Sequence, residues 1–122
     1  MTRTAVDIIL RAEGLAICAA GVAVWVANGG PPLLLIPAWL LVDLSMIGYL
    51  GGPLLGSITY NAAHNLVLAL ALFGLGWWIG LGWLVLTGAV FTTHIGLDRA
   101  LGYGLKLPTD FRDTHLGRIG KA

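Results

Sequence analysis

Two histidines and three carboxylates lie within the apolar part of this sequence, where ionisable side chains are rare: Glu13, Asp43, His64, His94 and Asp98. Imidazole and carboxylate groups together can bind a divalent metal such as Zn, Fe or Mn. Without a metal, the same groups can serve as an acid–base set that moves protons near neutral pH. A third interpretation is a network of internal ion pairs that only fixes how helices pack.

The end of the last apolar run places two of these groups together. On a helix, His94 and Asp98 are four residues apart and therefore share a face. His94-x3-Asp98 lacks the second histidine and the glutamate of the H-E-x-x-H zinc motif. The pattern indicates a polar site in an apolar environment, but its chemistry stays open at this point.

The composition indicates an integral membrane protein. The chain has 122 residues, of which 57% are hydrophobic and 11% charged, and its mean hydropathy is +0.86. These polar groups are too few to cover a water-soluble globule. The single cysteine, Cys18, cannot form an intramolecular disulfide. We expect a multi-pass protein of the cell (inner or plasma) membrane, whose partner is the lipid bilayer and not nucleic acid.

Four apolar segments predict transmembrane helices at about 4–27, 33–50, 56–79 and 83–99. Glycine and proline interrupt the sequence between them, at 28–32, 51–53 and 80–82. Each segment is close to the roughly 20 residues that cross a hydrocarbon core of about 30 Å. We therefore predict an all-α fold, a four-transmembrane-helix bundle over residues 1–105, with a basic C-terminal tail over 106–122. Charges at Asp7, Arg11 and Glu13 in the first segment are not typical of a cleavable signal peptide.

The distribution of positive charge predicts the orientation. Five of the seven lysines and arginines lie in the last quarter of the chain: Arg99, Lys106, Arg112, Arg118 and Lys121. Basic residues near membrane ends stay cytoplasmic, so we expect the C-terminus and, with an even number of spans, the N-terminus to be cytoplasmic. The tail could lie along the anionic inner leaflet. Alternatively it could fold back as a lid, which would bring Asp113 and His115 to the polar site.

This orientation brings the chemical residues to one depth. With a rise of about 1.5 Å per residue, Glu13, Asp43, His64 and His94 lie roughly 8–14 Å inside the cytoplasmic boundary. Charges within a membrane cost about 2.5–3.5 kcal/mol each on insertion scales, so they face the interior and pair. We predict one cytoplasm-facing pocket in which these four residues and Asp98 are the catalytic candidates. Asp43, His64, His94 and Asp98 are also the candidate ligands of a divalent metal.

Other residues would bind a ligand or support the pocket. Arg11 and Arg99 would supply counter-charges, and Asn61 and Asn65 share one face of the third helix. The full set of candidates in this group is Arg11, Tyr49, Tyr60, Asn61, Asn65, Arg99, Tyr103, Lys106 and His115. Within the spans, small residues would let the helices approach closely, at Gly14, Gly21, Gly74, Gly76, Gly88 and Gly96.

Five short patterns, spread over nearly the whole chain, carry a resemblance. They are Arg11-x-Glu13-Gly14, Asp43-x-Ser45-Met46-x-Gly48-Tyr49-Leu50, Tyr60-Asn61-x2-His64-Asn65, His94-Ile-Gly-x-Asp98-Arg99-x-Leu-Gly-Tyr-Gly-Leu-Lys106 and Thr114-His115-Leu-Gly-x-Ile-Gly-Lys121. Together they resemble the bacterial integral-membrane family catalogued as domain of unknown function 4260. The resemblance implies a small multi-spanning protein with polar motifs at the residues selected above, and its inclusion of His115 favours the lid. Val42 stands where we expect proline, which implies a less kinked second helix and leaves the direction of Asp43 open.

Three classes of function are compatible with this sequence. We favour a membrane-embedded enzyme or ligand-binding protein that acts on a lipid-like or small hydrophobic substrate by acid–base chemistry, with metal assistance if a divalent ion is bound. A proton-coupled small transporter would have to act as a homo-oligomer, because close helix packing leaves little room for a pore in one subunit. A structural or regulatory membrane subunit would use the polar residues for assembly alone.

Overall fold

The computed structural model describes residues 3–120 and is dominated by helices. Up to residue 100 the elements are α1 (Arg3–Ala27), the 3-10 helix η1 (Pro32–Leu34), α2 (Leu35–Asp43), the 3-10 helix η2 (Leu44–Gly51), α3 (Pro53–Ala63), α4 (Leu66–Ile79) and α5 (Gly82–Ala100). In the tail, β1 (Asp113–Thr114) pairs antiparallel with β2 (Gly117–Arg118). The predicted helical character is confirmed, and the two-residue strands are an addition to it.

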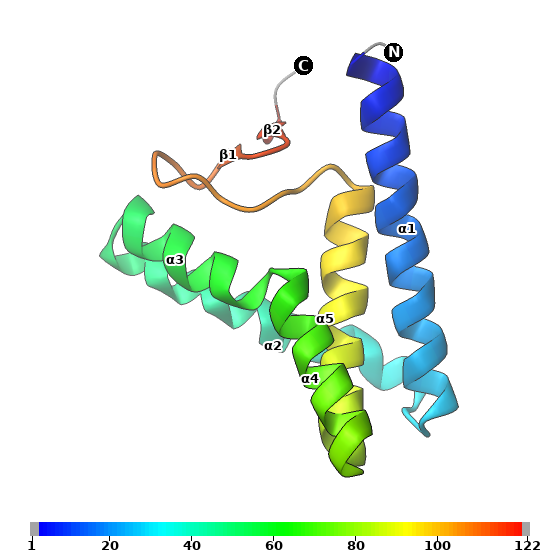
Figure 1. Ribbon diagram of the computed structural model, residues 1–122. Helices are drawn as coiled ribbons and strands as arrows, with labels where there is room; N and C mark the ends of the chain where they lie inside the picture. The colour runs from blue at the N-terminus through cyan, green and yellow to red at the C-terminus, as the bar shows by residue number, and fades with distance from the viewer. Residues whose placement is uncertain (1–2, 121–122) are drawn as a thin grey trace.

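Three helices lie side by side, and a helical hairpin projects from them. Helix α5 packs against α1 on one side and against α4 on the other, whereas α3 packs against η2. The η2–α3 pair runs obliquely to the other three helices, and the tail crosses above α3 and the end of α5 (Figure 1). The start of α1 and the tail lie at the same end of the molecule (Figure 1). Placement of that end in the cytoplasm stays a prediction.

The structure divides the predicted helix 56–79 into α3 and α4. His64 and Asn65 lie between the two helices and are not helical. The Asn65 side chain accepts a hydrogen bond from the Leu68 amide and donates to the carbonyl oxygens of Asn61 and Ala62. Asparagine is a preferred N-cap residue, because its side chain satisfies amides that the first helical turn leaves free. One side chain thus ends α3 and begins α4.

The second predicted helix, 33–50, also changes character along its length. Helix α2 ends at Asp43, and the chain continues as the tighter 3-10 helix η2. Val42, at the position where proline was expected, is 2% exposed and belongs to the hydrophobic core. The change from α-helical to 3-10 geometry therefore occurs at Asp43, without a proline. By contrast, the bounds of α1 and α5 lie within one residue of those predicted.

Three segments of the described chain are long and apolar enough to cross a membrane: Thr4–Ala27, Pro32–Gly51 and Pro53–Ile79. The predicted fourth span, 83–99, is not among them, because His94, Asp98 and Arg99 lower the hydropathy of α5. This helix contacts α1, α2 and α4 and buries a large share of its residues. The central helix is thus surrounded by protein, which makes an apolar composition less necessary for it.

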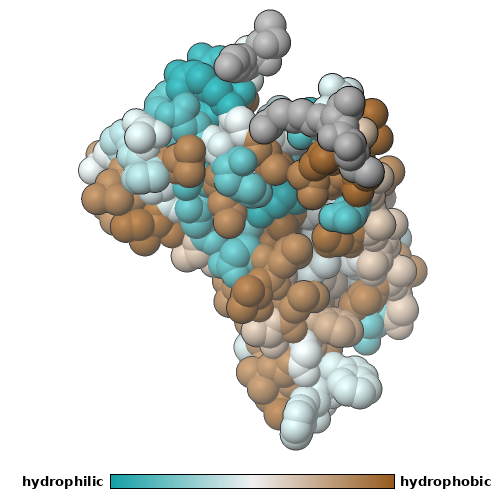
Figure 2. Space-filling view, turned by 45° about the horizontal axis from the view of Figure 1, so that its top comes forward, coloured by the Kyte–Doolittle hydropathy of each residue, from teal (hydrophilic) through white to brown (hydrophobic). Residues whose placement is uncertain are grey.

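The surface suits lipid better than water. The accessible area is 7303 Å², whereas a compact soluble protein of 12.8 kDa would expose about 6300 Å². Several large apolar side chains are at least 80% exposed, among them Leu50, Val67 and Trp78. Hydrophobic residues cover most of the face shown in Figure 2, while hydrophilic residues gather mainly over the tail. Apolar surface of this extent is a mark of contact with a membrane or a partner.

Glycines set the distance between α5 and its neighbours. A Cβ atom at Gly14 would lie 2.6 Å from the Ala100 amide nitrogen, and one at Gly88 would lie 2.5 Å from the Phe73 amide nitrogen. Similarly close contacts surround Gly21, Gly76 and Gly96, so five of the six expected glycines lie at helix contacts. Gly74 is the exception, because no atom lies within 4 Å of its Cβ position.

We predict that Gly88→Ala destabilises the α4–α5 contact. The added methyl group meets the α4 backbone, which cannot move away as a flexible side chain would, and overpacking of this kind costs about 1–3 kcal/mol. Gly74→Ala is the matched control on the facing helix and should be neutral or slightly stabilising, because it has room for the methyl group. Thermal unfolding in detergent, followed by tryptophan fluorescence, measures both. Equal melting temperatures would contradict this account of the packing.

Candidate His/Asp site

Four of the five predicted catalytic candidates lie together, where α2 ends, α3 breaks from α4, and α5 nears its end. His94 Nε2 lies 3.0 Å from Asp43 Oδ1 and 3.4 Å from Asp98 Oδ2. His64 Nε2 lies 3.2 Å from the same Asp43 oxygen and 3.3 Å from His94 Nε2. His64 Nε2 and Asp98 Oδ2 are 3.8 Å apart. The two histidines therefore face each other through the same ring nitrogen, with a carboxylate on either side.

The helix break positions His64. Its backbone amide still bonds to the Tyr60 carbonyl oxygen, as in a helix, and its ring Nδ1 lies 2.9 Å from that same oxygen. A carbonyl oxygen only accepts, so Nδ1 carries the hydrogen, and in the neutral ring Nε2 presents a lone pair to Asp43 and His94. Histidines that bind metals usually hold their second ring nitrogen in this way. The ring is fully buried, which fixes this orientation.

Three of these residues have the spacing of metal ligands. One ligand atom from each of Asp43, His64 and His94 lies within 4.8 Å of the others. For bonds of about 2.0–2.2 Å, the ligand atoms of a tetrahedral zinc ion are about 3.3–3.6 Å apart. The three separations between the ligand atoms of Asp43, His64 and His94 are 3.0, 3.2 and 3.3 Å. An ion would therefore need only small movements of these side chains.

Tyr60 holds the opposite side of the cluster. Its ring stacks on the His64 ring, with centroids 3.6 Å apart and planes 6° from parallel. Its hydroxyl donates to Asp98 Oδ2 across a long 3.4 Å contact. The side chain is 2% exposed. Tyr60 thus couples the orientation of a histidine to that of a carboxylate.

The tail lies against the site through Lys106. Asn61 Oδ1 accepts from the Lys106 amide at 2.7 Å, and Asn61 Nδ2 donates to the Lys106 carbonyl oxygen at 2.8 Å. The Lys106 side chain is 4% exposed, and its Nζ lies over the rings of Tyr60 and Phe111. Below it is a cavity of about 300 Å³, lined by Asp43, Met46, Tyr60, Asp98, Tyr103, Lys106, Phe111 and Ile119.

Glu13, the fifth catalytic candidate, lies outside the cluster. Its side chain is exposed on α1, and among residues 3–120 it has no ion pair. The reason is the packing of α1, whose contact with α5 is made through Gly14. Adjacent residues on a helix point about 100° apart, so Glu13, which precedes Gly14, lies on a different side of α1 from the contact with α5. The expectation that Glu13 would enter the pocket is corrected accordingly.

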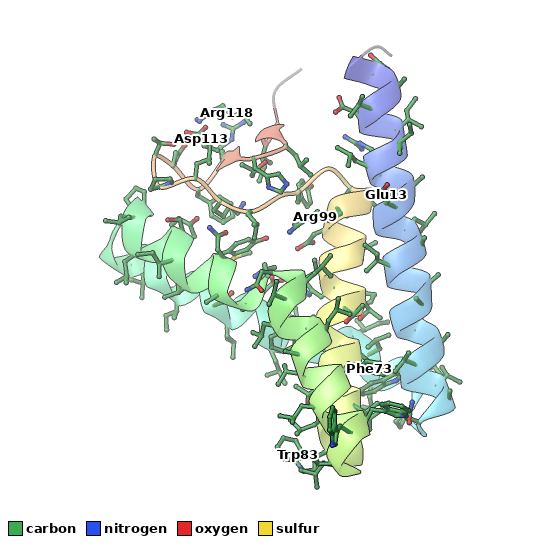
Figure 3. All side chains as sticks on the ribbon, in the orientation of Figure 1. Glu13, Phe73, Trp83, Arg99, Asp113 and Arg118 are labelled. Atoms are coloured by element: carbon green, nitrogen blue, oxygen red, sulfur yellow. The ribbon has the colours of Figure 1, made fainter. Side chains whose placement is uncertain are left out.

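The predicted counter-charges also take other positions. Arg99 donates to the carbonyl oxygens of Tyr103 and His64, so it joins the start of the tail to the helix break (Figure 3). Arg11 is exposed and lies beside Gly102, where it lines a separate cavity of about 880 Å³ between α1 and the tail. Within the described chain, neither arginine forms an ion pair with a carboxylate of the cluster.

The remaining candidates support the tail or the helices. Tyr49 packs edge-on against Phe111, and Tyr103 lines the cavity beside Lys106. His115 bonds to the backbone of Leu105 in the tail, so it does not join the cluster. Asp113 pairs with Arg118 across the β1–β2 hairpin, also away from the cluster (Figure 3).

Sequence reasoning did not select some residues that contact the site. Ser45 Oγ lies 3.4 Å from His64 Nδ1, and Met46 lines the cavity. In a 3-10 helix, residues three apart stand on the same side. The spacing Asp43-x2-Met46 would therefore have placed Met46 beside Asp43 only if a 3-10 helix had been predicted for η2. Phe111 and Ile119 carry no such signal, because they belong to the irregular tail.

The comparison with protein families covers almost all of these elements. A family model described as domain of unknown function (DUF4260) matches residues 7–119. The chain belongs to the DUF4260 family. No curated protein and no solved structure shows significant similarity to it. The DUF4260 match includes the two histidines and two aspartates of the cluster and the tail as far as Ile119, so it spans the helices and the segment that lies against them.

We predict that the tail of this DUF4260 protein loosens as the pH falls. Burial and the nearby Arg99 charge lower the pKa of His115 below its ordinary value of 6.5. The neutral ring accepts the Leu105 amide hydrogen at Nδ1, which a protonated ring cannot do. Its contribution to stability is therefore complete above pH 6.5 and is lost as the pH falls through the lower folded pKa.

Hydrogen–deuterium exchange in residues 104–118, corrected for the intrinsic pH dependence of exchange, measures this effect. Protection should fall between pH 7.5 and pH 5, while protection in α5 stays constant. In His115→Asn, which keeps an acceptor but does not titrate, the fall should disappear. An equal fall in the variant would assign the effect to other groups.

Proposed function

We propose that this DUF4260 protein is a membrane-embedded enzyme with a single transition-metal centre, zinc by preference, held by Asp43, His64 and His94. The observation that carries the proposal is the convergence of three ligand atoms: the two Nε2 atoms are 3.3 Å apart, and both lie within 3.2 Å of one Asp43 oxygen. Three protein ligands with a fourth position open to water are typical of catalytic zinc sites.

The tautomer of the neutral His64 ring favours a cation between the three ligand atoms. With its hydrogen on Nδ1, this ring offers only a lone pair to the Asp43 carboxylate, and two groups of that kind repel each other. A proton between the rings would relieve one such contact. A divalent ion equidistant from the three ligand atoms would relieve all of them together, and the similar separations of 3.0–3.3 Å support this geometry.

Asp98 would then act on the fourth ligand. Its Oδ2 lies 3.4 Å from one histidine nitrogen and 3.8 Å from the other, so it stands beside the proposed ion and not among its three ligands. A metal lowers the pKa of bound water, and a neighbouring carboxylate can accept the proton released. Tyr60 would hold Asp98 in position through its hydroxyl.

Hydrolysis of an ester-type bond is the reaction that these groups support best. A metal held by Asp43, His64 and His94 would supply an acidified water. Asp98 would accept the proton when one O–H bond of that water breaks, and the water oxygen would bond to the electrophilic atom of the substrate while the bond to the leaving oxygen breaks. Asp98 would then return the proton to the leaving oxygen, which restores the carboxylate. The apolar surroundings favour a lipid-like or small hydrophobic substrate, reached at the membrane boundary where the basic tail lies.

The test is metal analysis of the purified protein, with a histidine control. We predict about one zinc, iron or manganese per chain, which His64→Ala, His94→Ala and Asp43→Asn lose. His115→Ala removes the third histidine of the chain and should keep the metal, because within residues 3–120 that ring bonds to the tail backbone and not to the cluster. Asp98→Asn should keep it as well, with affinity reduced by about 10–100-fold at most, as for outer-shell partners.

The outcome that would overturn the metal centre is metal-free protein that also fails to take up added zinc, iron or manganese. The cluster would then be an acid–base pair in which the histidines share a proton, or a purely structural network. Melting temperatures separate these two. A structural network requires His94→Ala to destabilise the fold, whereas an acid–base site tolerates it.

A further inference from the structure

Lys106 is a buried cation with no hydrogen-bond partner for its ammonium group among residues 3–120. Its side chain is 4% exposed, and the contacts of Nζ are two aromatic faces, at 3.9 Å from the Phe111 ring centroid and 4.9 Å from that of Tyr60. Cation–π contacts offset part of the cost of burial, but they leave the N–H groups without acceptors. Because Lys106 lines a cavity, an ammonium group in this state can bind an acceptor that enters from outside.

The position of Lys106 is fixed by the backbone and not by its own charge. Asn61 bonds both its amide and its carbonyl oxygen, so the ammonium is brought to the cavity even without an ion pair. No carboxylate oxygen in the described chain lies within ion-pair distance of it. Burial lowers the pKa of Lys106, while the more distant charges of Asp98 and Asp43 raise it.

The cavity beneath Lys106 combines one cation with apolar walls. Its volume of about 300 Å³ is at the lower end of the range for small-molecule sites. Met46, Phe111 and Ile119 supply apolar surface, and Asp43 and Asp98 connect the cavity to the His/Asp cluster. A group bound to Nζ would thus lie in the same cavity as both carboxylates of the proposed centre.

We propose that this cavity binds an anionic amphiphile, with its phosphate or carboxylate on Lys106 Nζ and its apolar part against Met46, Phe111 and Ile119. The inference rests on the proposed function and names the substrate class of the same site. The net charge of the cavity favours an anion once a metal is bound. A divalent cation and the Lys106 ammonium then exceed the carboxylates of Asp43 and Asp98 by one positive charge. Without a metal the cavity carries one net negative charge, so anion binding should require metal loading.

The experiment measures dodecyl phosphate and dodecanoate binding to zinc-loaded protein in an uncharged detergent, with dodecanol as the uncharged probe. We expect Lys106→Met to weaken binding of both anions by at least tenfold and to leave dodecanol binding unchanged. Lys106→Arg keeps the charge and should retain binding to within a few fold. Arg118→Gln is the control for lost positive charge, because Arg118 pairs with Asp110 and Asp113 in the hairpin and does not line this cavity.

Two further probes identify the source of the anion. Inorganic phosphate or glycerol phosphate bound as tightly as dodecyl phosphate would identify a soluble ligand, and binding only of chain-bearing anions would identify a membrane lipid. Either result supports an oxyanion site on Lys106, but equal binding of the chain-free anions would overturn the proposed contact of an apolar chain with Met46, Phe111 and Ile119. Anion binding that is unchanged in Lys106→Met, or absent altogether, would overturn it.

Zinc content, measured in the same samples, separates this inference from the proposed function. If zinc stays at one per chain while Lys106→Met has no effect on anions, the substrate class is wrong and the metal centre stands. If zinc never binds but anion binding still depends on Lys106, the metal centre and the expected requirement for metal loading are both wrong, whereas the anion site on Lys106 stands. The melting temperature of Lys106→Met shows whether the variant folds, and Lys106→Arg keeps the inference testable if it does not.

Discussion

The structure depends on how the chain satisfies its backbone where α3 breaks from α4. In an apolar environment, each free carbonyl or amide group costs several kcal/mol, so broken helices survive only where other groups bond to the freed positions. Here the His64 ring bonds to the Tyr60 oxygen, Asn65 bonds to the Asn61 and Ala62 oxygens, and Arg99 bonds to the His64 oxygen. The contact that repairs the break also directs His64 Nε2 into the cluster, so the helix end and the candidate site have one cause.

The same break creates the space that the tail occupies. Because α3 turns aside and pairs with η2, the polar end of α5 is not covered by a helix, and the tail crosses it instead (Figure 1). Asn61, one turn before the break, binds the backbone of Lys106 and closes this cover. A single straight helix over 56–79 would have pointed Asn61 and His64 into a helix interface, with no cavity between them and the tail.

The sequence was enough to find the cluster but not its boundaries. Asp43, His64, His94 and Asp98 could be selected because charged and polar groups at equal depth in apolar segments must pair inside the protein. That reasoning failed for Glu13, because the depth of a residue does not say which way its side chain points around the helix axis. The rotation of α1 about its axis is set by its glycine contacts with α5. That reasoning also missed the helix break, because neither glycine nor proline marks it between residues 57 and 73 and the cap depends on the single side chain of Asn65. The burial of Lys106 was out of reach, because irregular tail segments carry no periodicity.

The low hydropathy of α5 follows from its position in this arrangement. A helix that carries His94, Asp98 and Arg99 would be costly to insert by itself, and it is also the helix that the other segments surround. Helix α4 is strongly apolar and is joined to α5 by a tight turn in which Gly80 adopts a left-handed conformation, with φ of 74°. Gly76 and Gly88 then allow the two helices to pack closely. The α4–α5 hairpin can therefore enter an apolar phase as a unit in which the apolar helix compensates the polar one. The cost of placing the polar cluster of α5 in an apolar phase is therefore offset by its packing against α4. The glycines and the short turn make that packing possible.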